Sequence, residues 1–179
     1  MHYIIRQSGI RPLHLAILES HQNLSKYLIE QDADVNIFSE TLVTPLHLAC
    51  DSGQLVICKL LLAKKADFTA SNEFGETPLH LSCKSGFAVV TMTLIEAGAD
   101  VNAADKRMET AFHHACVDGN LELVTMLLEH GANLSAVNKN QETCLMLAVK
   151  GGHRLVCKLL LSKGIDVTAR RIVRDHMYF

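Results

Sequence analysis

Histidine and cysteine are the residue types with the most chemistry to offer in this chain of 179 residues, which has 10 histidines and 6 cysteines. Imidazole and thiolate groups bind metal ions and act as catalytic bases and nucleophiles. The densest group, His113-His114-x-Cys116, has the spacing of neither a Cys-x-x-Cys pair nor a His-Glu-x-x-His helix. Lys150-Gly151-Gly152 likewise lacks the spacing of a phosphate-binding loop, and no Gly-x-Ser-x-Gly turn occurs. The sequence therefore predicts no enzyme, no metal site and no cofactor.

The elements that position these residues follow a repeat of 33 residues. Four similar tetrapeptides end in histidine and a fifth ends in methionine: Arg11-Pro12-Leu13-His14, Thr44-Pro45-Leu46-His47, Thr77-Pro78-Leu79-His80, Thr110-Ala111-Phe112-His113 and Thr143-Cys144-Leu145-Met146. Self-similarity at a fixed period without insertions is typical of a stacked repeat array. We therefore interpret the four histidines as structural. His114, which stands at the position of Leu48 and Leu81, is interpreted as a core residue that fits poorly.

The cysteines also follow the repeat. Cys50, Cys83 and Cys116 share one position, and Cys58 and Cys157 share another. Equivalent residues of stacked helices lie roughly 8 to 10 Å apart, which is too far for an unstrained disulfide. We therefore expect reduced cysteines. Together with an amino end that lacks a signal-peptide pattern, this favours a cytoplasmic or nuclear location.

Each repeat has the pattern of two short helices. In the second copy Thr44 caps a helix that starts at Pro45, and Gly53 ends it because glycine adopts a positive φ without steric cost. The next helix carries an apolar stripe that recurs in each repeat, as Ile57, Leu61 and Leu62, then Val90, Leu94 and Ile95, then Leu123, Leu127 and Leu128. Two small helices cannot cover this stripe alone, so neighbouring repeats must stack.

This pattern resembles the ankyrin repeat in its Thr-Pro-Leu-His helix start, its mid-repeat glycine and its ending, Gly98-Ala99-Asp100-Val101-Asn102. The resemblance implies an all-α solenoid of stacked antiparallel helix pairs with β-hairpin fingers. We expect a single domain over residues 1–179, with repeats at about 6–38, 39–71, 72–104, 105–137 and 138–170 and a short C-terminal tail at 171–179.

Several residues depart from the pattern. Arg11 replaces the capping threonine, and Ser20 and Asp32 stand where other repeats have glycine, so the first repeat is the least regular. Lys65 also stands at a glycine position, where a positive φ is unfavourable, and its turn is expected to be strained or differently shaped. Met146 replaces the fifth histidine, which in ankyrin repeats helps to tie neighbouring hairpins together. The last repeat is therefore expected to open first.

Composition narrows the classes of function. A chain that is 49% hydrophobic and 20% charged, with net charge −2, is expected to fold and offers no overall basic face for nucleic acid. No run of eighteen apolar residues predicts a membrane span. The resemblance implies a non-catalytic module that binds a partner protein, either a folded domain or an extended segment. We expect a monomer that takes no small-molecule substrate and binds neither nucleic acid nor a membrane.

The resemblance also implies where that partner binds, on the concave surface and the fingers. The implied residues are Phe38, Thr41, Leu42 and Val43 from one finger, Glu73, Phe74 and Glu76 from the next, Lys106, Arg107, Met108 and Glu109 from the third, and Asp51, Lys84 and Asp118 on the helical floor. Four of them, Phe38, Leu42, Phe74 and Met108, are large apolar groups where solvent contact is expected, so they are candidate anchors. The alternative is that Phe38 or Val43 packs within its own hairpin or against the next finger.

Other interpretations stay open. The module is either a recognition arm of a larger scaffold or adaptor, as the apolar ends Ile4-Ile5 and Met177-Tyr178-Phe179 suggest, or a small complete inhibitor that masks its partner. A nucleic-acid role would use the basic tail Arg170, Arg171 and Arg174, and an enzyme would need perturbed titratable groups that converge in a pocket. Asp100-Val101-Asn102 after Leu94 is similar to ankyrin segments hydroxylated on asparagine by a 2-oxoglutarate oxygenase. Asn36 is a second candidate, and we favour the alternative of structural turn asparagines.

Overall fold

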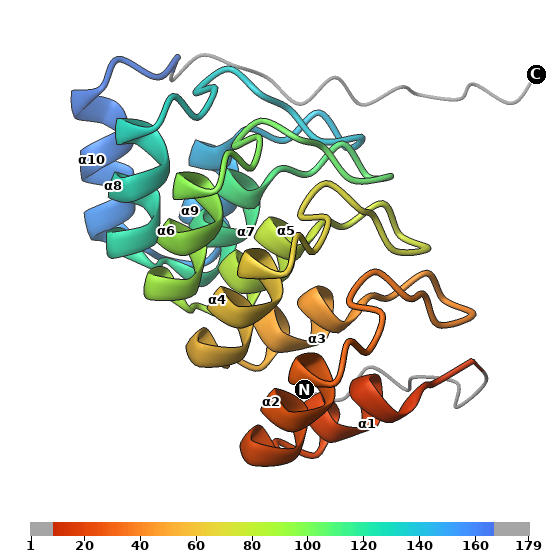
Figure 1. Ribbon diagram of the computed structural model, residues 1–179. Helices are drawn as coiled ribbons and strands as arrows, with labels where there is room; N and C mark the ends of the chain where they lie inside the picture. Colours follow the sequence, from red (N-terminus) through yellow and green to blue (C-terminus); the bar gives the residue numbers. More distant parts are fainter. Residues whose placement is uncertain (1–8, 167–179) are drawn as a thin grey trace, which may run out of the picture.

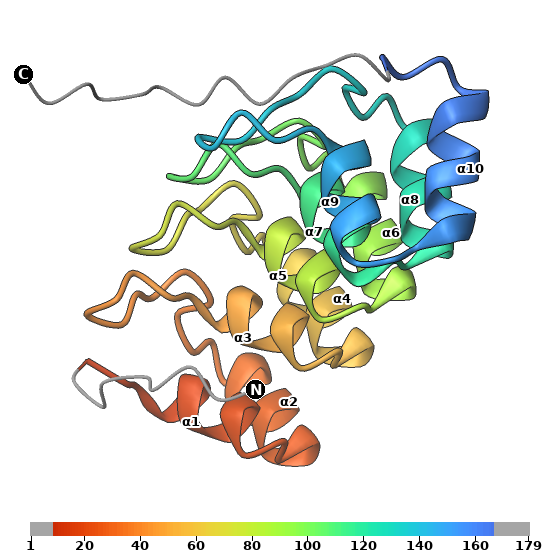
Figure 2. The ribbon, with the colours of Figure 1, turned by 180° about the vertical axis from the view of Figure 1, so that it is seen from behind.

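Residues 9–166, which are the residues that the computed structural model describes, form ten short helices in five helix–turn–helix pairs. The pairs are α1 (Pro12–Leu18) with α2 (Gln22–Glu30), α3 (Pro45–Asp51) with α4 (Leu55–Ala63), α5 (Pro78–Lys84) with α6 (Ala88–Glu96), α7 (Ala111–Asp118) with α8 (Leu121–Glu129), and α9 (Cys144–Lys150) with α10 (Arg154–Ser162). The first helices stack into an inner row beside the hairpin fingers, and the second helices form an outer row (Figures 1 and 2). The stacked helix pairs predicted from the repeat are confirmed.

The core runs continuously through the stack, because the same stripe is buried in every inner repeat. Leu61, Leu94 and Leu127 have no exposed surface, and Ile57 and Leu123 at the other stripe position have none either. In the first pair Leu24, at the position of Ile57, is 47% exposed because no helix pair precedes it among the described residues. Burial of this stripe therefore comes from the neighbouring repeat, as the sequence predicted.

Each repeat contains three turns with left-handed backbone. The inter-helix turn has Gly53 at φ 68°, and the turn after the second helix has Gly98 at φ 99°. Lys65 adopts φ 63° at the second of these turns. Its N–H donates to the Leu62 carbonyl and the Ala66 N–H donates to the Leu61 carbonyl, which is the same pattern of hydrogen bonds as in the turn at Gly98. The turn is therefore strained rather than differently shaped.

The third left-handed turn, at the tip of each finger, was not predicted. The fingers are hairpins in which, among residues 9–166, pairing between extended segments is limited to the isolated bridges Ala104–Thr110 and Val137–Thr143. The tip residue has positive φ in every described finger, at Gly9, Leu42, Gly75, Met108 and Gln141, again 33 residues apart. The fingers are thus tight turns more than β-ribbons.

The junction with the last repeat lacks contacts that the earlier junctions have. His113 Nε2 is buried and has no hydrogen-bond partner, whereas the Nε2 atoms of His14, His47 and His80 each bond a carbonyl of the next finger. Each of the four histidines also accepts, through Nδ1, a bond from the backbone N–H of the residue that caps its helix, and Met146 has no ring nitrogen for this role.

We expect residues 143–166 to be the least protected helical segment in hydrogen exchange, opening with a free energy below that of the central repeats. Amide exchange followed by mass spectrometry measures this directly. Finding residues 143–166 to be the most protected segment would contradict the prediction.

Candidate functional site

The second to fifth fingers have their tips at residues 40–42, 73–75, 106–108 and 139–141, after the first tip at Gly9. One polar side chain in each of these four fingers holds its tip in place. Asn72 Oδ1 accepts hydrogen bonds from the N–H groups of Phe74 and Glu76, at 2.9 and 3.0 Å. Asp105 Oδ1 accepts from the equivalent N–H groups of the next finger, at 2.7 and 2.8 Å. These acceptors satisfy backbone donors that the turn would otherwise leave unpaired, so they fix the shape of each tip.

Neighbouring tips are also joined to one another. The Glu73 N–H donates to the Thr41 carbonyl at 3.0 Å, and the Lys106 N–H donates to the Phe74 carbonyl at 3.0 Å. The Lys139 N–H continues the series to the Arg107 carbonyl at 2.8 Å. The tips therefore form one connected comb along the solenoid, visible as the row of projecting loops in Figure 1.

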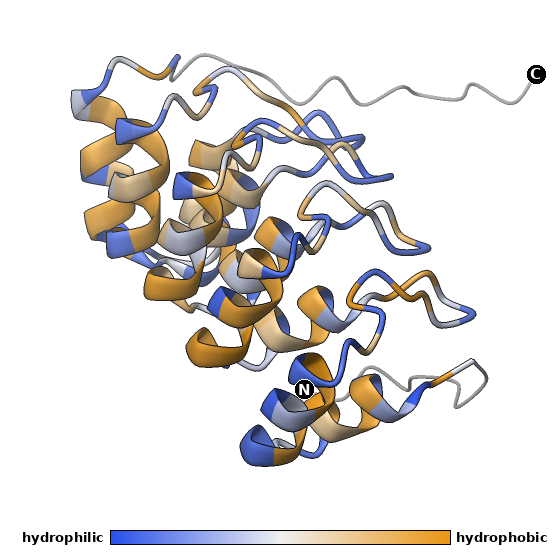
Figure 3. Ribbon diagram, in the orientation of Figure 1, coloured by the Kyte–Doolittle hydropathy of each residue, from blue (hydrophilic) through white to orange (hydrophobic). Residues whose placement is uncertain are grey.

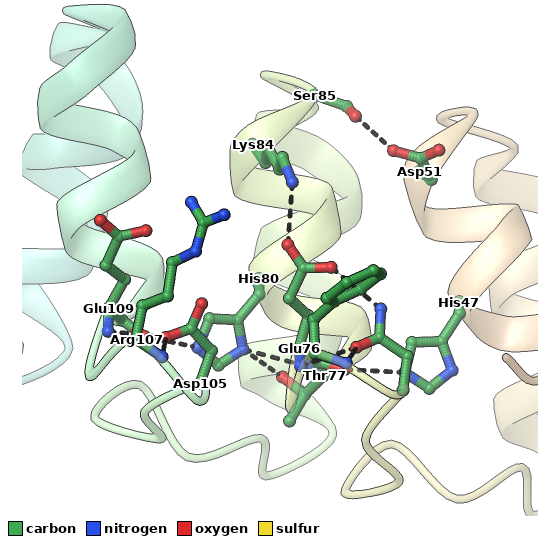
Figure 4. A network of polar contacts seen from close by, with 12 residues as sticks. His47, Asp51, Glu76, Thr77, His80, Lys84, Ser85, Asp105, Arg107 and Glu109 are labelled. Atoms are coloured by element: carbon green, nitrogen blue, oxygen red, sulfur yellow. Dashed lines mark hydrogen bonds and ion pairs between the residues drawn. The ribbon is translucent and has the colours of Figure 1, made fainter. Parts of the chain in front are cut away.

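The repeat histidines connect this comb to the inner helices. The backbone N–H of Thr44 donates to Nδ1 of His47 at 3.2 Å, so the ring carries its proton on Nε2 and donates it to the Glu76 carbonyl at 3.1 Å. Burial lowers the pKa of His47 to about 4, which keeps the ring neutral at physiological pH. His80 makes the equivalent bond to the Glu109 carbonyl. These two histidines are structural, as predicted (Figure 4).

Large apolar side chains are displayed on the comb. Phe38, Leu42, Phe74 and Met108 are 45 to 52% exposed, on fingers that are otherwise mainly hydrophilic (Figure 3). Leu42 and Met108 both adopt φ 60°, a left-handed conformation that two other fingers give to glycine, at Gly9 and Gly75. The structure therefore places all four candidate anchors in contact with solvent.

The other predicted site residues divide into displayed and internal groups. Asp51, Glu73, Lys106, Arg107 and Asp118 are exposed, and Thr41, Lys84 and Glu109 are half-buried. Val43 is half-buried and packs against the core. Glu76 is only 3% exposed, so its carboxylate faces the protein interior rather than the concave surface.

The carboxylate of Glu76 makes polar contacts with residues inside the protein (Figure 4). Its Oε1 pairs with the Lys84 ammonium at 2.8 Å, and its Oε2 accepts from the Asn72 amide at 2.9 Å. Burial alone would raise the pKa of Glu76, but these two partners outweigh it and hold the pKa below its ordinary value. At the edge of this region Asp51 accepts a bond from the Ser85 hydroxyl at 2.7 Å, linking neighbouring inner helices.

Sequence reasoning missed the residues that shape the tips. Asn72 and Asp105 were not singled out, although Ser39, Asn72, Asp105 and Asn138 recur at one repeat position as short side chains with a hydrogen-bond acceptor. Residues of this kind favour turns because they bond nearby backbone N–H groups. Applying that rule to the 33-residue alignment would have located the tips.

The cysteines offer little reactivity in the described residues. All six thiols are free, and burial raises the pKa of Cys83 to about 12. Equivalent cysteines of different repeats are too far apart to pair, but two cysteines within one repeat lie close together: the sulfurs of Cys50 and Cys58 are 3.7 Å apart between α3 and α4. Burial also raises the pKa of Cys50, so this thiol stays protonated.

The two candidate hydroxylation residues carry structural contacts. Asn102 donates to the Gly131 carbonyl at 3.0 Å and accepts from the Asn133 N–H at 2.8 Å. Asn36 makes the same pair of bonds, to the Lys65 carbonyl at 3.3 Å and from the Asp67 N–H at 2.7 Å. Each side chain thus joins its loop to the next repeat. Hydroxylation of these residues stays a prediction.

The stacked pairs and their connected fingers define the chain as a helical-repeat solenoid. The family model described as ankyrin repeats matches it in overlapping segments at residues 2–72, 38–105, 57–138 and 89–171. The chain therefore belongs to the ankyrin repeat family, and the all-α ankyrin solenoid predicted from the sequence is confirmed. No curated protein matches it significantly.

Membership of this family supports a general role. Ankyrin repeats are generally protein–protein interaction modules and are typically non-catalytic. Between residues 9 and 166, no helix is sufficiently long and apolar to cross a membrane. The apolar ends and the basic tail with Arg170, Arg171 and Arg174 lie outside the described residues.

Proposed function

We propose that this chain is a recognition module that binds a partner protein across its finger tips and inner helices, as an arm of a larger scaffold or adaptor. The observation that carries the proposal is the row of half-exposed apolar side chains on the comb, Phe38, Leu42, Phe74 and Met108. Such side chains become strong contributors when a partner buries them.

Backbone conformation supports a binding role for the tips. A residue other than glycine in the left-handed region costs of order 1 kcal/mol. The second and fourth described tips have Leu42 and Met108 in this conformation, although Gly75 occupies the same position in the finger between them. Packing does not account for these side chains, since both are about half exposed. A contact outside the chain would give both of them a role, which supports the proposal.

Charges between the anchors would orient the partner. Glu73, which is negative, and Lys106 and Arg107, which are positive, are exposed beside the apolar tips. Charges at the rim of an interface affect association rate and specificity more than affinity. The six free thiols fit a reducing compartment, so we place this recognition in the cytoplasm or nucleus.

Affinity capture from cell extract tests the proposal. The double variant Phe74→Ala/Met108→Ala is compared with the wild type and with Val56→Ala/Val89→Ala, which removes side chains of similar exposure from the outer helices. We expect specific proteins to be lost only with the finger variant, since each anchor contributes on the order of 2 kcal/mol. Melting temperatures should be unchanged because the removed groups are not core. Identical capture by all three proteins would reject the finger surface as the binding site.

A further inference from the structure

A group of ligand-type side chains lies where the third and fourth fingers meet α7. One potential ligand atom from each of Glu76, Asp105 and His114 lies within 4.8 Å of the other two. Glu76 and Asp105 are only 3 and 7% exposed. Figure 4 shows these two carboxylates at the bases of neighbouring fingers, on either side of His80. The group is therefore assembled by stacking from three separate elements.

His114 is the residue at this place that packing does not explain. The same repeat position is leucine in the other inner helices. Leu48, Leu81 and Leu147 are 6 to 8% exposed, whereas Leu15 in the first pair is 50% exposed. The Nε2 atom of His114 has less than 1 Å² exposed and no hydrogen-bond partner. A buried polar atom without a partner costs roughly 1 to 3 kcal/mol, so leucine would be the more stable choice.

The histidine is in the form that binds metal ions. Burial, together with the nearby His80 ring and Lys84 ammonium, lowers the pKa of His114 to about 4, although the Glu76 and Asp105 carboxylates act in the opposite direction. The ring is therefore neutral at physiological pH, with a nitrogen lone pair available. Its ring also meets that of His80 edge to face, with centroids 6.1 Å apart, which holds it beside the carboxylates.

We propose that Glu76, Asp105 and His114 bind a zinc ion. Zinc takes nitrogen and carboxylate ligands at about 2.0 to 2.2 Å, and an open site has three protein ligands and a water. In a tetrahedron with such bonds the ligand atoms are about 3.4 Å apart, so modest side-chain rotation would bring the present group into range. Oδ1 of Asp105 accepts the two backbone hydrogen bonds that hold its finger tip, so Oδ2 is the oxygen that would bind the ion. Lys84 competes with the ion for Glu76.

Bound zinc would tie the bases of the third and fourth fingers to α7. Those fingers carry Phe74 and Met108, so the ion would stiffen the comb at its centre. This assignment gives His114 a role other than the one expected from the sequence, which was a core residue that fits poorly. Sequence spacing could not reveal the group, because Glu76 and Asp105 precede His114 by 38 and 9 residues, in different repeats. The proposal does not depend on the fingers binding a partner.

The repeat itself supplies two matched variants. His114→Leu installs the residue of the other repeats, and Asp105→Asn installs the residue found at Asn72 and Asn138, which keeps the tip acceptor while removing the charge. Both variants are expected to fold, and circular dichroism checks this. His130→Gln, at an exposed histidine, controls for adventitious zinc binding.

The test is titration of the chelator-treated, reduced protein with zinc chloride. Isothermal titration calorimetry measures the affinity, and thermal denaturation with and without zinc measures the change in melting temperature. We expect one saturable site, a zinc-dependent rise in melting temperature, and affinity losses of at least tenfold in His114→Leu and in Asp105→Asn. Lys84→Met should bind several-fold more tightly because it removes the competing ammonium. Cobalt should give a tetrahedral visible spectrum in the wild type and in His130→Gln but not in His114→Leu. No saturable binding, or wild-type binding by both His114→Leu and Asp105→Asn, would overturn the proposal.

Discussion

Acidification from pH 7 to pH 5 is expected to destabilise this protein by several kcal/mol, well before its carboxylates titrate. Burial lowers the pKa of five inner-helix histidines below the ordinary value of 6.5, and for His47 and His114 the pKa falls to about 4. Below pH 6.5 the unfolded chain takes up protons at these sites while the folded chain does not. Stability contributed by the neutral rings is therefore complete above pH 6.5 and is lost as the pH falls toward 4.

The size of the effect follows from the shift. A pKa lowered from 6.5 to about 4 in the folded state makes His47 alone contribute a loss of roughly 2 kcal/mol by pH 5. His114, whose pKa is also lowered to about 4, adds a loss of similar size. For a chain of this size 1 kcal/mol corresponds to about 2 to 4 °C in melting temperature, so a fall of about 10 °C or more is expected.

Carboxylates modify this profile only at lower pH. The pKa values of Asp67, Glu76 and Glu142 are lowered by hydrogen bonds or by lysine partners, so their contributions are lost below their ordinary values, in the same direction as those of the histidines. Burial raises the pKa of Asp118, which opposes them. The loss between pH 6.5 and 5 thus belongs mainly to the histidines.

Calorimetric melting at pH 7.5, 6 and 5 measures how steeply the melting temperature falls with pH. His114→Leu should show a shallower loss than the wild type, because one buried imidazole is gone, whereas replacing the exposed His21 by glutamine should leave the slope unchanged. A melting temperature that is constant from pH 7.5 to pH 5, or equal slopes for all three proteins, would show that the histidines do not control acid stability.

The repeat made most of the fold predictable. Periodic burial of Leu61, Leu94 and Leu127, the proline starts of the inner helices and the glycines between helices all follow from one alignment of the sequence with itself. These features are local or involve adjacent repeats, so spacing is enough to locate them. Solvent exposure of the four apolar finger residues was predictable for the same reason, because the stacking pattern leaves those positions unused.

The parts that were not predicted depend on contacts between side chains of different repeats. Glu76 looked like a surface residue, but Lys84 and Asn72 provide charge and hydrogen bonds that let it be buried. The Cys50–Cys58 contact depends on how α3 packs against α4. The left-handed tips were hidden because leucine, methionine and glutamine occupy three of the five tip positions, and these residues do not indicate positive φ.

Replacing the tip residues Leu42 and Met108 by glycine is expected to separate binding from stability. Glycine adopts φ near 60° without steric cost, so each change relieves strain and should leave the protein as stable as before or up to about 1 kcal/mol more stable. The larger entropy of glycine in the unfolded chain offsets part of this gain. Few native contacts are lost, since Leu42 and Met108 are 49 and 52% exposed.

Affinity for a partner captured by the wild type should change in the opposite direction. Loss of an apolar anchor costs on the order of 2 kcal/mol, which is roughly 30-fold in the dissociation constant, and the double variant could approach 1000-fold if the two sites act independently. The backbone remains in place because the tips are held by Ser39 and Asp105, not by the side chains removed. A loss of affinity would therefore report the side chains themselves.

Gln141 provides the matched control, because it occupies the same tip position at φ 58° but has a polar side chain. Gln141→Gly should give the same relief of backbone strain as Leu42→Gly while affinity stays within about twofold of the wild type. Chemical denaturation and surface-immobilised binding assays on the single and double variants measure the two quantities separately. If Leu42→Gly and Met108→Gly bind as tightly as Gln141→Gly, the strained apolar tips have no part in recognition. If they bind weakly but are also destabilised, the strain interpretation is wrong and these side chains stabilise the fold.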